Sequence, residues 1–177
     1  EFEDAVLECI DPRFHQHTSE AVASGANTTS FDLLSCAGGS LGYSDPIKGK
    51  EYWRDWILDH VEATIQLHHV KRLKVVDHMQ CGAYGLRYDT RDRKGKVIRK
   101  ITREEEEGFH FANLRKLRVE FRKRFPGLEV RLFLAKIVKR DKKLIHEYHE
   151  VDPLPKLPAT PELHAQHPEP PPQQNVH

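Results

Sequence analysis

The segment LKVVDHMQCG, residues 73–82, decides both the fold and the candidate site of this sequence. Its first half, Leu73–Asp77, is a short apolar run with two adjacent valines, which is typical of a buried strand. The strand leads directly into His78 and Cys81, two residue types that bind metal ions in proteins. We therefore predict a buried strand that carries candidate metal ligands at its carboxyl end.

Two earlier runs have the same character as this strand. Residues 5–10, AVLECI, end at Asp11-Pro12, and residues 30–36, SFDLLSC, end at Gly38-Gly39. Between these runs and the end of the chain the apolar period changes to that of helices. The helical stripes predict core-facing helices within residues 49–69 (Trp53, Ile57, Val61 and Ile65) and within residues 111–125 (Phe111, Leu114, Leu117, Phe121 and Phe125).

The remaining segments complete the fold prediction. Residues 87–107 hold eight basic and six acidic side chains and few apolar ones, which predicts a solvated loop or excursion. Residues 128–138 and 144–151 read as strands joined by a charged turn. Strands that alternate with helices indicate parallel pairs joined by crossovers. We predict an α/β fold with a mostly parallel central sheet flanked by helices and a C-terminal antiparallel edge hairpin.

Composition restricts the class of protein. Among 177 residues, 28 Lys and Arg face 27 Asp and Glu, a formal charge of +1, so we expect neither nucleic acid nor a membrane as partner. No apolar run reaches the roughly 20 residues of a membrane span, and the first residues lack a signal-peptide pattern, which predicts a soluble, cytoplasmic protein. Eight of the 11 prolines lie in residues 152–177. We predict one domain at 1–151 and an extended or disordered Pro-rich tail at 152–177.

The cysteines and histidines point to a metal site. Three cysteines, spread far apart, do not form a disulfide framework. Cys9 ends the first predicted strand, and His78 and Cys81 follow the third, so parallel pairing brings them to one edge of the sheet. Thiolates with an imidazole favour zinc, and three protein ligands leave a fourth position open, as in catalytic sites. Singly, each cysteine is also consistent with a buried core thiol.

The two motifs together resemble the β-class carbonic anhydrases. That family pairs a Cys-x-Asp-x-Arg segment, here Cys9, Asp11 and Arg13, with a later His-x-x-Cys-Gly, here residues 78–82. The segment FDLLSCAGG, residues 31–39, is similar to the second strand and turn of that family. The resemblance implies a β-carbonic anhydrase-like fold and a carbonate dehydratase, a lyase that hydrates carbon dioxide to bicarbonate reversibly by a metal-bound hydroxide.

The resemblance also implies roles for individual residues. Zn²⁺ would be held by Cys9, His78 and Cys81, with Asp11 and Arg13 as the catalytic pair, in a homodimer or higher homo-oligomer. Gly38, Gly39 and Gly82 would line the substrate pocket, although a turn with positive φ is the simpler reading of Gly38-Gly39. Asp77 stands where the family has glycine, and we expect it either to hydrogen-bond His78 and orient its ring or to depress the reactivity of the hydroxide. We expect Cys36 to be a buried small residue near the site.

Two alternatives remain open. The same site can serve a hydrolase of carbonyl sulfide or carbon disulfide, which are linear analogues of carbon dioxide. The chain can also be a zinc-binding homologue without hydration activity, acting as an interaction or RNA-binding module through the basic segment 115–124. The aromatic residues of that segment fall on its apolar stripe, so no stacking platform for bases is predicted.

Overall fold

The computed structural model describes residues 3–23 and 30–153, so the predicted tail lies, beyond its first two residues, outside the described residues. The strands are β1 (Asp4–Glu8), β2 (Asp32–Ser35), β3 (Arg72–His78), β4 (Thr90–Arg91), β5 (Val97–Arg99), β6 (Glu129–Arg140) and β7 (Lys143–Glu150). The helices are α1 (Pro12–Ala23), α2 (Ser40–Ser44), α3 (Tyr52–His68), α4 (Gly82–Tyr88) and α5 (Arg103–Arg124).

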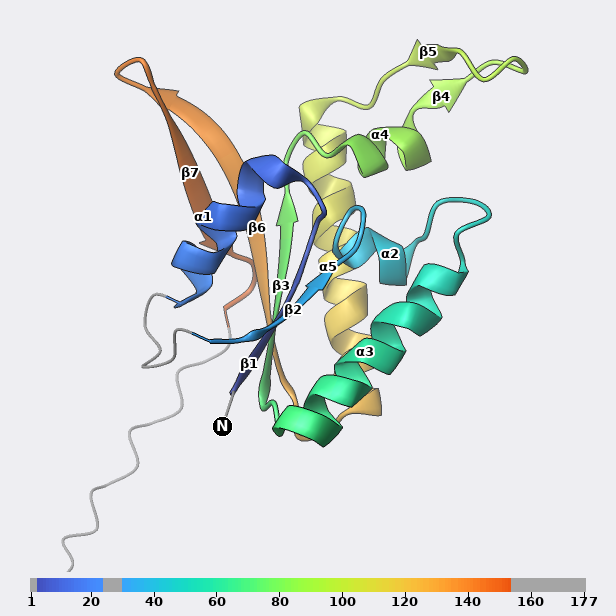
Figure 1. Cartoon of the computed structure of the whole chain (residues 1–177). Coiled ribbons are helices and arrows are strands. Elements are labelled where there is room, and N and C mark those ends of the chain that lie inside the picture. Colours follow the sequence, from blue (N-terminus) through green and yellow to red (C-terminus); the bar gives the residue numbers. More distant parts are fainter. Residues whose placement is uncertain (1–2, 24–29, 154–177) are drawn as a thin grey trace, which may run out of the picture.

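A five-stranded sheet with the order β2-β1-β3-β6-β7 forms the centre of the molecule. β1 pairs in parallel with β2 and β3, and β3 pairs in parallel with β6, whereas β7 returns antiparallel to β6. Figure 1 shows α1 on one face of this sheet and α3 and α5 on the other. The predicted α/β class, with a mostly parallel sheet and a C-terminal antiparallel hairpin, is confirmed.

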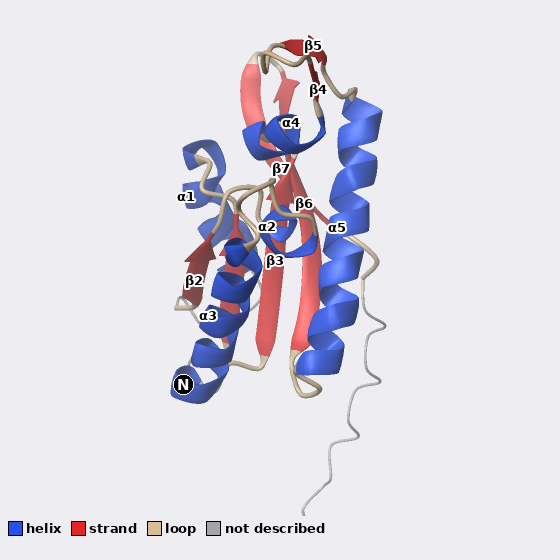
Figure 2. Cartoon of the chain, turned by 90° about the vertical axis from the view of Figure 1, so that its right-hand side faces the viewer, coloured by secondary structure: helices blue, strands red, loops and turns tan. Residues whose placement is uncertain are grey.

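The main core lies between the sheet and the pair α3 and α5, which Figure 2 shows in front of the strands. Ile57 and Val61 of α3 are buried, as are Leu114, Leu117 and Phe121 of α5. These residues belong to the two predicted apolar stripes, which confirms that both stripes face the core. Their burial against the strands fixes the sheet and thereby the edge at which β1 and β3 end.

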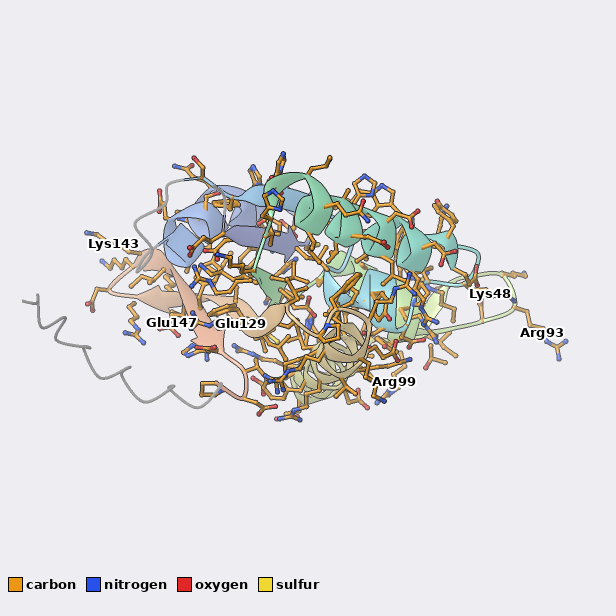
Figure 3. The ribbon with its side chains drawn as sticks, turned by 90° about the horizontal axis from the view of Figure 1, so that it is seen from below. Lys48, Arg93, Arg99, Glu129, Lys143 and Glu147 are labelled. Carbon is orange, nitrogen blue, oxygen red and sulfur yellow. The ribbon has the colours of Figure 1, made fainter. Side chains whose placement is uncertain are left out.

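The charged segment 87–107 differs from its prediction. It contains the hairpin of β4 and β5, whose Arg93 projects far from the body of the molecule in Figure 3, but α5 already begins at Arg103. Thr102 Oγ1 accepts a hydrogen bond from Glu105 N, and the Glu105 carboxylate accepts one from Thr102 N. This capping box, and acidic residues that favour a helix N-terminus, make residues 103–107 the first turn of a helix, so the loop prediction is wrong there.

Three helices have no counterpart among the predicted elements. α1 is short of apolar residues, and α2 and α4 span five and seven residues, too few for a periodic pattern to be recognised. They matter because α1 and α4 immediately follow the candidate ligands Cys9 and Cys81. Within the described residues, no helix is long and apolar enough to cross a membrane.

Candidate metal centre

The structure brings the three predicted ligands together. Cys9 follows β1, His78 is the last residue of β3, and Cys81 lies between β3 and α4. Because β1 and β3 are neighbouring parallel strands, their carboxyl ends meet at one edge of the sheet. One ligand atom of each residue lies within 4.8 Å of the other two, and all three residues are buried. The group is positioned to bind a metal ion.

The His78 imidazole is oriented for coordination through one ring nitrogen. Its Nδ1 lies 3.0 Å from the Met79 carbonyl oxygen, so Nδ1–H donates there and Nε2 carries the free lone pair. Nε2 is buried and has no hydrogen-bond partner among the described residues. The ring of Phe14 stacks on the imidazole with the centroids 4.3 Å apart. A buried ring nitrogen without a partner is costly, and a bound cation would satisfy it.

The two sulfur atoms are close enough to share one cation. Cys9 Sγ and Cys81 Sγ are 3.8 Å apart, and the Gly38 backbone N–H donates to Cys9 Sγ at 3.3 Å. The Cys81 thiol donates to Cys9 and, with nearby His78 and the Gly38 N–H, lowers the pKa of the Cys9 thiol to about 4. The pKa of Cys81 is raised, because a second negative charge beside the Cys9 thiolate is unfavourable. When one of the two thiols ionises, the surroundings thus favour the negative charge on Cys9.

Asp11 and Arg13 form the predicted pair beside the ligands. Arg13 Nε donates to Asp11 Oδ1 at 2.9 Å, Arg13 Nη2 donates to Oδ2 at 2.6 Å, and the Arg13 backbone N–H adds a bond of 3.0 Å. This grip lowers the pKa of Asp11 to about 2. Asp11 Oδ2 lies 3.8 Å from His78 Nε2. A permanently ionised carboxylate thus faces the atoms that would hold the metal.

The loop that carries Cys81 makes a tight turn. Gln80 has a φ of 59°, a left-handed conformation that is uncommon for a residue with a side chain. Arg13 Nη2 also donates to the Gln80 carbonyl oxygen at 3.1 Å, and the Cys81 backbone N–H donates to Glu106 Oε1 at 2.8 Å. The turn returns Cys81 to the side of His78, and it is held from both α1 and α5.

The glycines and Cys36 surround this group in different ways. Gly38 and Gly39 have φ values of 81° and 56°, which confirms the expected turn with positive φ. Gly82 is the first residue of α4, and a Cβ atom there would meet nothing within 4 Å. That the three glycines line a substrate pocket stays a prediction. Cys36 is buried in the main core, as expected, and burial together with the nearby Cys9 raises the pKa of its thiol to about 11.

Asp77 points away from the ligands, because successive strand residues face opposite sides of a sheet. Its Oδ1 accepts from Ser40 N at 2.8 Å, and its Oδ2 accepts from Ser40 Oγ at 2.6 Å and from the Tyr84 hydroxyl at 2.8 Å. His110 Nδ1 lies 3.0 Å from the same Oδ2. The proposed bond from Asp77 to His78 is thus replaced by the bond from His78 Nδ1 to the Met79 carbonyl.

Two residues near the site were missed by the sequence analysis. Glu106 and His110 lie four positions apart on α5, the spacing of side chains on one helical face, and both are buried. The signal was present in the sequence, but Glu106 stood within a segment assigned to a solvated loop. A buried carboxylate and imidazole at helical spacing mark a polar contact of the helix with the core.

The basic residues of α5 are largely engaged by acceptors of the chain itself. Arg115 and Arg118 both donate to Asp152, which directly follows the edge hairpin. Lys116 Nζ donates to the Ser44 carbonyl oxygen at 2.8 Å, and Arg124 lies 3.7 Å from Glu62. These contacts pin the helix and reduce the charge that it offers to a nucleic acid.

Comparisons with known proteins identify relatives of unassigned activity. No family model matches the chain. An uncharacterized protein of Rickettsia conorii is 31% identical over 130 residues, which cover 73% of this chain and 64% of that protein. An uncharacterized protein of Rickettsia bellii is 30% identical over 132 residues, which cover 73% of each chain. The chain therefore belongs to one family with the Rickettsia bellii protein, and it spans somewhat less than two thirds of the length of the Rickettsia conorii protein.

Proposed function

We propose that the chain is a zinc enzyme that hydrates carbon dioxide to bicarbonate reversibly, on a site like that of the β-class carbonic anhydrases. One observation carries the proposal: a buried Cys-His-Cys group has an ionised Asp11, clamped by Arg13, directly beside its free imidazole nitrogen. Three ligands leave a fourth position of a tetrahedral ion for water, which is the arrangement of catalytic zinc. A purely structural zinc site has four protein ligands as a rule.

The ligand atoms support zinc in particular. Two thiolates and a neutral imidazole are a donor set that zinc favours. With zinc–sulfur bonds of about 2.3 Å and a tetrahedral angle, two bound sulfurs stand roughly 3.8 Å apart. The Cys9 and Cys81 sulfurs are 3.8 Å apart. The unpartnered His78 Nε2 is the third donor atom.

The residues beside the metal ligands have distinct tasks in this mechanism. A zinc ion held by the three ligands would lower the pKa of its water toward about 7 and so supply a nucleophile near neutral pH. Asp11, whose pKa Arg13 holds low, would accept a hydrogen bond from the attacking water and so orient a lone pair of its oxygen toward the substrate. Arg13 donates to both carboxylate oxygens and so keeps the Asp11 side chain in its orientation beside His78 Nε2.

The site is partly open to solvent on the side of Asp11 and Arg13. The Asp11 side chain is 18% exposed and that of Arg13 is 46% exposed, so solvent reaches the group from this side. Ile10, between Cys9 and Asp11 in sequence, is 64% exposed and offers apolar surface next to it. We include in the proposal a homodimer or higher homo-oligomer, and we keep carbonyl sulfide and carbon disulfide as alternative substrates.

Metal analysis combined with stopped-flow carbon dioxide hydration tests the proposal. We expect about one zinc per chain. The variant Asp11→Asn should keep its zinc and lose at least ~10²-fold in kcat, the low end for a group that handles a proton. Asp59→Asn, an exposed position on α3, is the matched control and should match the parent.

Each contrary result overturns a defined part of the proposal. If the zinc-loaded protein turns over carbonyl sulfide or carbon disulfide but not carbon dioxide, the proposed substrate is wrong and one of these two molecules takes its place. Zinc without turnover of any of the three would refute an enzyme of this type. An absence of zinc in protein purified without chelators and reloaded under reducing conditions would refute the metal centre itself.

A further inference from the structure

A closed ring of polar contacts lies behind the candidate metal centre and is not used by the proposed reaction. Its ionisable members are Asp77 on β3 and Glu106 and His110 on α5, and all three are buried. The ring runs from Asp77 to His110, along one turn of α5 to Glu106, and from Glu106 to the backbone of Cys81. Buried ionisable groups are costly unless they are paired, so such a ring requires a physical reason.

Glu106 is the member that touches the metal-ligand loop. Its Oε1 accepts the Cys81 backbone N–H at 2.8 Å. Burial raises the pKa of Glu106, but the nearby His110 imidazole and the backbone of Cys81 and Gln80 outweigh it and lower the pKa. Cys81 is the N-cap of α4, where backbone N–H groups have no partner within the helix, and its own side chain forms no capping hydrogen bond. The carboxylate from α5 satisfies the backbone N–H of the N-cap residue itself, while the Cys81 sulfur lies 3.8 Å from that of Cys9.

His110 braces Glu106 against the strand that carries the metal histidine. Its Nδ1 is 3.0 Å from Asp77 Oδ2 and its Nε2 is 3.7 Å from Glu106 Oε1. Burial favours the neutral imidazole, but the two carboxylates outweigh it and raise the pKa of His110. Asp77 is itself fixed by Ser40 and by the Tyr84 hydroxyl.

The turn between His78 and Cys81 needs such support. Gln80 occupies the left-handed region, which is unfavourable for a residue with a side chain. Arg13 holds the carbonyl oxygen of Gln80 from one side, and Glu106 holds the N–H of the next residue from the other. Together the two contacts select the one loop conformation in which the Cys81 sulfur lies 3.8 Å from that of Cys9.

We propose that Glu106, braced by His110, is a positioning residue that preorganises Cys81 and thereby sets the affinity and the coordination geometry of the metal centre. The inference rests on the metal site of the proposed function, but it does not depend on carbon dioxide as substrate. Removal of a group that orients a metal ligand weakens metal binding by about 10–100-fold. Through this ring, the packing of α5 against β3 increases the affinity of the site for the metal ion.

Competition titration of zinc against a chromophoric chelator tests the proposal with the full chain. We expect Glu106→Ala to raise the zinc Kd about 10–100-fold. Glu106→Gln keeps an oxygen for the Cys81 N–H but loses the charge, and charged hydrogen bonds are roughly twice as strong, so we expect a smaller rise of about three- to tenfold. Glu107→Ala and Glu107→Gln change an exposed neighbour on the same helix turn and should keep the parent Kd.

Cobalt substitution separates positioning from a general loss of stability. The ligand-field bands of Co²⁺ bound to the parent should have the high intensity of a tetrahedral ion, and those of both Glu106 variants should weaken and shift. His110→Gln should reproduce the effect of Glu106→Gln, while thermal unfolding of the metal-free proteins reports the change in fold stability separately. If Glu106→Ala does not fold, Glu106→Gln and His110→Gln carry the test.

The results have distinct meanings. Glu106 and His110 variants with a zinc Kd within twofold of the parent and an unchanged cobalt spectrum would overturn the inference, whatever their stability. Equal losses in the Glu106 and Glu107 variants would also overturn it. A parent chain that fails to bind zinc would refute the metal centre of the proposed function. A parent chain that binds zinc normally, together with variants of unchanged affinity, would refute only the positioning role of Glu106.

Discussion

The substitution Gly39→Ala tests how tightly the backbone before α2 packs against the polar ring. Gly39 has a φ of +56°, and a Cβ atom there would lie 2.5 Å from Asp77 Oδ1 and 3.2 Å from the Val76 carbonyl oxygen. A carbon cannot approach an oxygen so closely, so the Asp77 carboxylate must move. Its Oδ1 would then lose the hydrogen bond from Ser40 N, which is 2.8 Å long in the parent.

The cost of this substitution follows from three contributions. Gly39 has a ψ of −112°, so it lies outside the left-handed helical region, and a non-glycine residue there costs about 1–3 kcal/mol. Loss of a buried hydrogen bond to a charged group costs about 1.5–3 kcal/mol. Alanine also reduces the entropy of the unfolded chain and returns about 0.4–1 kcal/mol. We expect Gly39→Ala to lower the free energy of unfolding by about 3 kcal/mol, which is roughly 6–12 °C in Tm for a domain of this size.

Urea unfolding of the metal-free protein measures this loss, and Gly49→Ala is its matched control. Gly49 also has a positive φ, +80°, but a Cβ atom there would meet nothing within 4 Å. The control therefore carries the backbone strain without the collision, and we expect it to cost about 1 kcal/mol or less. Equal losses in the two variants would show that the close approach of Gly39 to Asp77 does not affect the free energy of unfolding, and would refute the reasoning.

Two further predictions concern the ion pairs of Asp4 on β1 and the N-terminus of α5. Burial raises the pKa of Asp4, but hydrogen bonds from Arg72 and Lys74 outweigh it and lower the pKa. A group with a lowered pKa stabilises the fold above its unfolded-state pKa. This stabilisation is lost as the pH falls through the folded-state pKa. Urea unfolding between pH 7 and pH 2 should therefore show that Asp4→Asn costs on the order of 3 kcal/mol at pH 7 and removes part of the acid dependence, whereas an unchanged pH profile would contradict it. Thr102→Ala removes the hydroxyl that accepts from Glu105 N and should cost about 1 kcal/mol, with faster amide exchange in the first turn of α5; unaltered exchange there would show that the capping box is dispensable.

The long-range periodic patterns of the sequence were enough to predict the architecture. The stripes of α3 and α5 and the short apolar runs of β1, β2 and β3 are strong signals, because burial against a sheet imposes them. The charged segment before α5 failed as a prediction, since high charge is common to solvated loops and to the first turn of a helix. The spacing of Thr102 and Glu105, a capping box, distinguishes the two cases and was present in the sequence.

The candidate ligands were predictable for a different reason. Cys9, His78 and Cys81 each follow or end a strand, and parallel neighbours bring their ends together, so the topology alone places the three residues at one edge. The turn at Gln80 could not be predicted, because its left-handed conformation is imposed by contacts from residues distant in sequence. Glu106 was missed because its segment was assigned to a solvated loop, and its contact with Cys81, which joins positions 25 residues apart, could be seen only in the fold.

Asp77 and His78 show why the core and the site cannot be treated separately. Neighbours on one strand, they face opposite sides of the sheet: His78 joins Cys9 and Cys81, while Asp77 joins α5 through His110. A shift of β3 at Asp77 would also displace the His78 ring nitrogen, because the two residues share a peptide unit. The polar ring is therefore linked to two of the candidate ligands, to His78 through the strand and to Cys81 through Glu106, and it holds both in the arrangement that could accept an ion.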